Sequence, residues 1–342
     1  MRLTAFPPIL RSRRAARAAC IACALVFATQ AHAEGKVRIV DQFGIGSLLL
    51  KVAKDQKLIE KEGAKEGLAI DVQWSELSGG AAVNDTLLSG AADVATIGIG
   101  PLLTVWDRTH GKQDFRAMAA LGAVPVYLVT NNPRIRTIKD FGESDRIAVV
   151  SVAVSQQGRL LQMASAKAFG DDQYARLDAL EVSMPHADAT TAMLVGNSSI
   201  DAHFSNAPFQ YQELENPKIH KVLSSSDILG GPSTIAVAAS SAKWRSDNPK
   251  TYRAVRAALA DAAALVAADK SKAAAIYIRQ DSSKLSPAFV ERILNDPGTS
   301  FVTTPQNTLP LGTFLHKVGV IRNEPKSWRD YFFDDQPASA GS

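Results

Sequence analysis

Residues 36–110 repeat one pattern three times: a short apolar strand, a turn that contains glycine, and a helix. The strand-like segments are 36–41, 68–74 and 94–97, and glycine-containing turns follow them at 43–46, 78–80 and 98–101. Alternation of this kind is typical of a parallel sheet with helices on its faces. The turns would then lie at the carboxyl ends of the strands, where α/β proteins bind their ligands.

A second series follows the first. Strand-like segments at 147–150, 180–184, 200–204 and 219–223 alternate with helical stretches at 155–169, 188–195 and 208–214. Further strands are predicted at 115–121, 124–130 and 233–239. After residue 243 the pattern is mostly helical, with an alanine-rich helix after Asn248-Pro249 and helices near 286–295 and 307–318. We therefore predict an α/β fold with two parallel or mixed sheets flanked by helices.

The first 33 residues have the pattern of a cleaved signal peptide. Residues 2–17 carry five arginines and no acid, residues 18–28 are apolar, and Ala31-His32-Ala33 resembles a cleavage site. The apolar run is far shorter than the about 20 residues that span a bilayer. We expect cleavage after Ala33. Ser12-Arg13-Arg14 leaves the choice between the general and the twin-arginine export routes open.

Removal of this segment changes the charge and the cysteine content. The whole chain has a net charge of +4, but residues 34–342 contain 33 basic and 34 acidic residues, a net charge of −1. The basic balance that would favour nucleic acid therefore disappears. Cys20 and Cys23 leave as well, and neither follows a lipoprotein pattern. We expect an exported, periplasmic protein without disulfides.

Signals of catalysis are missing from the sequence. It contains no G-x-S-x-G motif and no Walker A run. Gly44-x-Gly46 and Gly98-x-Gly100 follow strands but lack the third glycine of a dinucleotide site. The histidines after residue 33 do not have metal-ligand spacing, and no cysteines accompany them. We therefore predict no catalytic residue, no metal site and no cofactor.

Two helix starts suit a small anion. Ser78-Gly79-Gly80 and Val154-Ser155-Gln156-Gln157 each precede a helix, where free backbone N–H groups and a hydroxyl meet the positive end of the helix dipole. Ordinary capping explains either turn taken alone. One such turn in each series could clamp a single anion between two lobes. His186 and His203 also follow predicted strands, and ligand contact and a purely structural hydrogen bond both stay open for them.

These turns belong to a longer resemblance. The chain resembles nitrate/sulfonate/taurine-type solute-binding proteins of ABC importers over nearly all of residues 34–342. The first half carries it at Trp74, 78–80, Asn84-Asp85, 88–90, Asp93 and 98–101. The second half carries it at 128–133, 138–141, 145–149, 154–157, 161–163 and 229–232. Val150-Ser151-Val152 departs from the pattern, because relatives often have a proline there.

The resemblance implies a two-lobed, type II-like periplasmic receptor. It would close on a small anionic solute and deliver it to an ABC permease with its ATPase, as a monomer that binds no nucleic acid and is not an enzyme. Nitrate, sulfonate or taurine, another organic anion or a pyrimidine-like compound all stay open as the solute. The alternatives are an enzyme on the same fold, such as one that makes a pyrimidine precursor, and a sensor domain.

The resemblance also implies a domain division. Lobe 1 would comprise 34–128 and 235–334, lobe 2 would comprise 129–234, and 335–342 would be a flexible tail. Two crossover strands would form the hinge, and two sequential domains are the alternative. The expected ligand-binding residues lie in the matching turns: Phe43, Gly44, Ser78, Gly79, Gly80, Ile99, Gly100, Ser155, Gln156, His186 and His203.

Overall fold

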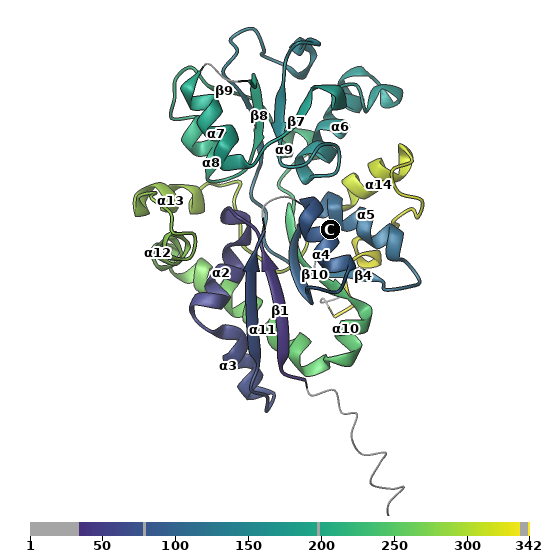
Figure 1. The fold of residues 1–342 in the computed structure, drawn as a ribbon, viewed down its shortest axis with the longest axis vertical. Helices are drawn as coiled ribbons and strands as arrows, with labels where there is room; N and C mark the ends of the chain where they lie inside the picture. Colours follow the sequence, from purple (N-terminus) through teal and green to yellow (C-terminus); the bar gives the residue numbers. More distant parts are fainter. Residues whose placement is uncertain (1–33, 78–79, 197–198, 336–340) are drawn as a thin grey trace, which may run out of the picture. The chain divides into compact units, whose positions relative to one another are not determined.

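The computed structural model describes residues 34–77, 80–196, 199–335 and 341–342. The predicted signal peptide and the turn residues Ser78 and Gly79 lie outside these ranges. Residues 35–342 form one compact unit. That unit contains two five-stranded sheets with helices around each of them (Figure 1). The predicted α/β class with two mixed sheets is confirmed.

The first sheet has the strand order β2-β1-β3-β10-β4. Its parallel part consists of β1 between β2 and β3, and β10 runs antiparallel to both β3 and β4. The strand bounds are β1 Lys36–Asp41, β2 Asp71–Glu76, β3 Val94–Gly98, β4 Phe115–Ala120 and β10 Ala236–Ser241. A strand that comes late in the chain thus completes a sheet that the first residues begin.

The second sheet has the same design, in the order β7-β6-β8-β5-β9. Here β6 lies parallel to β7 and β8, while β5 runs antiparallel to β8 and β9. The bounds are β5 Tyr127–Thr130, β6 Ile147–Val149, β7 Glu181–Ser183, β8 Ala202–Ser205 and β9 His220–Ser224. In both sheets the parallel strands direct their carboxyl ends towards the helices that follow them.

The helices divide between the two sheets along the chain. Those before β5 are α2 Leu48–Asp55, α3 Leu58–Lys65, α4 Gly80–Leu88 and α5 Ile99–Thr109. Those between β6 and β10 are α6 Gln156–Phe169, α7 His186–Val195, α8 Phe209–Glu213 and α9 Ser225–Leu229. After β10 come α10 Ala242–Asp247, α11 Pro249–Ala268, α12 Lys270–Gln280, α13 Pro287–Leu294 and α14 Leu309–Lys317.

Some predicted bounds were wrong for local reasons. The helix expected at about 47–61 is interrupted because Lys57 adopts a left-handed φ of 50°, which separates α2 from α3. The last strand begins at Ala236 rather than 233, since Thr234 bonds to the loop at Gln306 instead of a neighbouring strand. By contrast, α6 ends beside Gly170 as expected, with φ of 109° at that glycine.

Apolar packing connects the two halves as well as filling each one. One cluster buries Leu49 of α2 and Leu259 of α11 beside the first sheet. Another contains Leu102 of α5, Leu161 of α6 and Leu311 of α14. Since α5 follows the first sheet and α6 belongs to the second, this cluster joins the two halves on one side of the unit.

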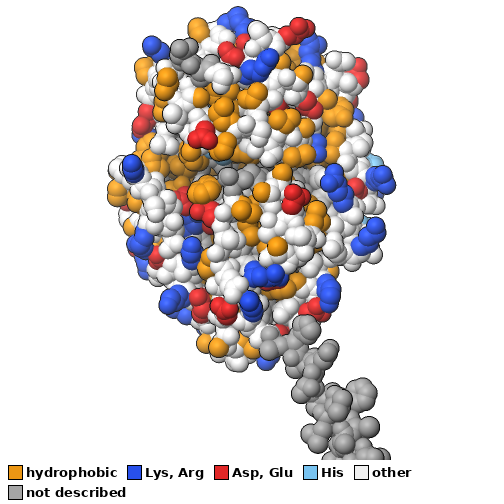
Figure 2. Space-filling model, viewed as in Figure 1, with side chains coloured by type: hydrophobic (Ala, Val, Ile, Leu, Met, Phe, Trp, Pro, Cys, Tyr) orange, Lys and Arg blue, Asp and Glu red, His pale blue; other side chains and the backbone are white. Residues whose placement is uncertain are grey.

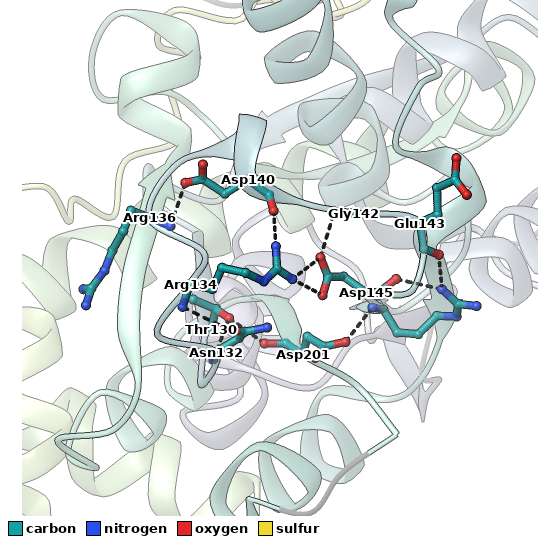
Figure 3. Close-up of polar contacts among 10 residues, drawn as sticks. Thr130, Asn132, Arg134, Arg136, Asp140, Gly142, Glu143, Asp145 and Asp201 are labelled. Carbon is teal, nitrogen blue, oxygen red and sulfur yellow. Dashed lines mark hydrogen bonds and ion pairs between the residues drawn. The ribbon is translucent and has the colours of Figure 1, made fainter.

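A polar network holds the connection between β5 and β6 (Figure 3). Both carboxylate oxygens of Asp145 accept hydrogen bonds from Arg134 Nη2, at 2.7 and 2.8 Å, and Asp145 also accepts from the Gly142 backbone N–H. Arg134 further donates to the carbonyl oxygen of Asp140, and Asp201 accepts from the Arg146 N–H. We call these residues the Arg134 network, and it gives a physical reason for the polar motifs at 138–141 and 145–149.

Candidate functional site

A cavity of about 310 Å³ lies between the carboxyl ends of the two sets of parallel strands. The first half contributes the residues after β1, the end of β3 and the crossover at 122–126. The second half contributes the starts of α6 and α7 and the turn after β8. Figure 2 shows hydrophobic side chains gathered at mid-height, between the parts that carry the two sheets. This is where the α/β topology predicts a ligand.

Four of the predicted site residues line this cavity: Phe43, Ser155, Gln156 and His186. Phe43 is half exposed, whereas Ser155, Gln156 and His186 are buried. His186 begins α7, and Ser155 is the N-cap of α6, where its Oγ accepts from the Gly158 N–H at 3.1 Å. Residues from α6 and α7, 30 positions apart in sequence, therefore meet at one wall.

Four other predicted residues lie behind the walls rather than in them: Gly44, Ile99, Gly100 and His203. Gly44 has a φ of 104°, and its position lies against the carbonyl of Ala207 in the other half. His203 is fully buried on β8 and contacts His186. In the predicted turn at 78–80, Gly80 begins α4, and Ser78 and Gly79 lie outside the described residues.

The Gly98-x-Gly100 turn lets the two halves approach each other closely. Gln156 Oε1 accepts a hydrogen bond from the Gly100 N–H at 2.6 Å. A Cβ atom at Gly98 would lie 2.8 Å from Gln156 Cβ, and one at Gly100 would lie 3.0 Å from Arg159 Cγ. Larger residues would thus collide with α6. Gly100 is a predicted ligand-binding residue, but its N–H group has a protein partner here.

Sequence reasoning missed several lining residues. Gln42, Ser47 and Thr96 contribute polar groups from the first half, and Gln157 and Asn206 from the second. Gln42 follows β1 directly and Asn206 follows β8 directly, so the rule that ligands meet strand ends would have found both. Gln157 lies in the predicted Val154–Gln157 turn, but the prediction stopped at Gln156.

The cavity lining is mainly apolar and carries no permanent charge. Among the described lining residues there is no lysine, arginine, aspartate or glutamate, and His186 is the group that can change its charge. Val124, Val126, Phe209 and Ile235 contribute to the apolar part of the wall. The amide nitrogen of Gln156, Nε2, is buried and has no hydrogen-bond partner among the described residues. Such a lining suits a solute with an apolar body and one polar group.

Burial shifts the pKa values of ionisable groups near the cavity. It lowers the pKa of His186 well below the ordinary value, and the electrostatic effect of the neighbouring His203 lowers it further. It also raises the pKa of Glu181 to about 7, against the opposing effect of the hydrogen bond from the Ala153 N–H. Burial lowers the pKa of the Arg159 guanidinium. Each shift reflects the cost of charge in a low-dielectric interior.

Within the described part of the chain, no group of three or more His, Cys, Asp or Glu side chains is arranged to hold a metal ion. Across the same residues, no helix is both long and apolar enough to cross a membrane. The cavity instead offers shape, an apolar wall and neutral hydrogen-bonding groups.

Two sheets with facing strand ends and a cavity between them give this chain the fold seen in solved periplasmic binding proteins. The chain belongs to the NMT1-like family, whose model matches residues 48–279. A search of curated proteins finds no match.

Solved structures show the same fold. The alkanesulfonate-binding protein SsuA from Xanthomonas axonopodis pv. citri, bound to MOPS, aligns with a TM-score of 0.67 at 20% identity, over 85% of this chain and 95% of that one. The periplasmic aliphatic sulphonate binding protein SsuA from Escherichia coli gives 0.63 at 19% identity, over 87% and 99%. The periplasmic nitrate-binding protein NrtA from Synechocystis PCC 6803 gives 0.66 at 15% identity, over 87% and 84%.

Proposed function

We propose that this chain is the periplasmic solute receptor of an ABC importer and that its solute is a small organic anion with an apolar body. The cavity between the facing strand ends is the observation that carries the proposal. Similarity to sulfonate- and nitrate-binding proteins supports the transport role and the anionic class. The permease with its ATPase is the proposed partner, and the receptor acts as a monomer without catalysis.

The size and lining of the cavity favour an organic anion over nitrate. Nitrate has four heavy atoms, whereas a cavity of about 310 Å³ reaches the range of small-molecule sites. The apolar wall around Val124, Val126 and Phe209 would cover a hydrocarbon or aromatic body. The polar groups at the starts of α6 and α7 would meet the charged head, where the helix dipoles favour negative charge.

The proposed division into lobes follows the sheet membership. Lobe 1 would carry β1–β4 and β10 with the later helices, and lobe 2 would carry β5–β9. The chain passes between the sheets at 121–126 and 230–235, and these crossings are the proposed hinge. Hydrogen bonds between the halves, such as Ile45 N–H to Ala207 O at 3.1 Å, would form on closure and break on release.

Thermal unfolding of the purified chain tests the receptor. The panel contains alkyl and aryl sulfonates, taurine, nitrate, aromatic carboxylates and pyrimidines, after refolding to remove any solute acquired during expression. A ligand of the folded state stabilises it by about 2.7 kcal/mol at a hundredfold excess over its Kd. We expect a rise in Tm with organic sulfonates or carboxylates that exceeds the rise with nitrate. Conversion of a panel compound into product would contradict the proposed receptor function and favour an enzyme.

A further inference from the structure

A chain of buried side chains runs from the cavity into the second half of the unit. Gln157 Nε2 lies 3.2 Å from His186 Nε2, His186 Nδ1 lies 2.7 Å from His203 Nε2, and His203 Nδ1 lies 2.6 Å from Glu213 Oε1. We call these four residues the relay. Its outer members, Gln157 and His186, line the cavity, whereas His203 and Glu213 are fully buried.

Four elements hold the relay in place: Gln157 lies in the first turn of α6, His186 starts α7, His203 lies on β8, and Glu213 ends α8. The Thr190 hydroxyl donates to Glu213 Oε1 at 2.9 Å, and the Phe209 ring stacks on His186 with centroids 5.6 Å apart. Packing on several sides therefore fixes the positions of the heavy atoms, whereas the number and positions of the protons on them can change.

The hydrogen bonds restrict where those protons lie. When the relay carries one negative charge, Glu213 accepts from His203 Nδ1–H and His203 Nε2 accepts from His186 Nδ1–H. His186 Nε2 is then an acceptor, so the Gln157 NH₂ group donates to it and its oxygen is left for the cavity. With one more proton, His186 Nε2 carries hydrogen. It then donates to the Gln157 oxygen, and the amide rotates its NH₂ group towards the cavity.

The relay supplies the titratable charge that the cavity lining otherwise lacks. The ionisable groups that contact His186 and extend the chain are His203 from β8 and, beyond it, Glu213 from α8. From α6 the neighbour is the uncharged Gln157, and from α8 it is the Phe209 ring. On its own helix, Asp188 is exposed. Burial disfavours the charged form of His186, because it lowers the pKa of that imidazole.

We propose that an anionic head group binds at Gln157 and His186 together with one proton that the relay takes up, and that Glu213 sets this proton uptake without touching the solute. This inference rests on the proposed function and adds a positioning residue to its site. An anion favours the state that turns N–H groups towards the cavity, and by linkage the proton favours the anion. A neutral solute with a hydrogen-bond donor would favour the opposite state.

Calorimetric titration across pH 6–9 tests the proposal, with the most stabilising sulfonate or carboxylate of the panel as the probe. Titrations in two buffers of different ionisation enthalpy give the number of protons taken up. In the wild type we expect the uptake of up to one proton per solute bound. The Kd should rise by up to about tenfold per pH unit in the range where the relay without solute has lost this proton. Glu213→Gln removes the carboxylate at nearly constant volume. We expect no proton uptake in this variant, and a weak, pH-independent Kd.

Asp145→Asn is the matched control, because it removes another buried carboxylate in the same half and leaves the relay intact. It should keep the wild-type pH profile. Should Glu213→Gln fail to fold, as judged by circular dichroism, Thr190→Val provides a second test. This variant removes only the hydroxyl donor to Glu213, so the relay should hold its proton more tightly. The midpoint of the change in Kd with pH should therefore move to higher pH.

The outcomes separate the inference from the proposed function. Anion binding without proton uptake in the wild type would overturn the inference and leave the receptor standing. A wild-type pH profile in Glu213→Gln, or an unchanged midpoint in Thr190→Val, would overturn it as well. If no panel compound bound at any pH, the proposed receptor function would be contradicted, and the inference that rests on it would fail as well. Proton release on binding of a neutral solute would overturn the anionic assignment.

Discussion

The Arg134 network and the relay each place a buried carboxylate against a basic side chain in the same half of the molecule, but they differ in the charge of that basic partner. Asp145 faces the guanidinium of Arg134 through two hydrogen bonds and also accepts a backbone N–H. Glu213 faces an imidazole, and its second oxygen, Oε2, has no hydrogen-bond partner among the described residues. The first carboxylate has a permanent cation beside it, whereas the second depends on a proton.

This difference separates a structural network from a responsive one. A guanidinium stays charged at every pH at which the protein folds, so the Arg134 network has one state. An imidazole can gain or lose a proton, so the relay has at least two protonation states of similar geometry. The Arg134 side chain is also about half exposed, whereas His203 and Glu213 are fully buried. Solvent therefore screens the first network and not the second.

The largest expected effect comes from cutting the relay at its buried end. Glu213→Leu leaves the His203 Nδ1–H and the Thr190 hydroxyl without their acceptor. We expect a loss of about 3–5 kcal/mol in the free energy of unfolding, measured by urea denaturation at pH 7. Glu215→Leu, two residues further on at an exposed ion pair with Arg292, should cost less than about 1 kcal/mol. Equal losses in the two variants would contradict the comparison.

A third carboxylate sharpens the comparison, because Glu181 is buried with a backbone donor but no imidazole. The folded state raises its pKa from 4.5 to about 7, so the stability it contributes is complete below pH 4.5 and is lost as the pH rises through about 7. Glu181→Gln mimics the protonated form. Between pH 4.5 and 7.5 the variant should gain up to about 3 kcal/mol relative to the wild type in urea denaturation. If the free energies of unfolding of the two proteins changed in parallel with pH, folding would not raise the pKa of Glu181.

The smallest effect is expected in the Arg134 network. Arg134→Lys keeps the positive charge but loses the two-bond geometry with Asp145. Because the Arg134 side chain is about half exposed and screened by solvent, the loss in the free energy of unfolding should be the smallest of the three in chemical denaturation. It should also be the same at pH 6 and pH 9. A pH-dependent loss would mean that this network responds to protons as the relay does.

Much of the fold could be predicted from hydrophobic periodicity and from glycine and proline positions. The strands at 36–41 and 147–149 and the helix that ends before Gly170 follow such local signals. The interruption at Lys57 could not be predicted, since no glycine or proline marks it. The late start of β10 depends on the contact of Thr234 with a loop about 70 residues away, and local sequence does not contain such contacts.

The candidate site was only partly predictable, and for a related reason. Strand ends and helix starts indicate Ser155 and His186 from sequence, because those positions follow from the α/β topology. That Gly100 meets Gln156 rather than open space depends on how α5 packs on α6. Glu213 carries no signal of its own in the sequence. Its role appears only when β8 and α8 bring it against His203.

Isothermal titration of a variant with a blocked cavity tests the central claim, that this cavity between the two sheets is the binding site, most directly. Ala187 is exposed and lines the cavity, so Ala187→Trp should fill it without disturbing the core. Leu194→Trp, at an exposed position on the same helix, is the matched control. With the most stabilising organic anion, we predict a Kd at least about 100-fold weaker in Ala187→Trp, a loss of about 2.7 kcal/mol, and unchanged in Leu194→Trp. Wild-type affinity in Ala187→Trp would contradict the account.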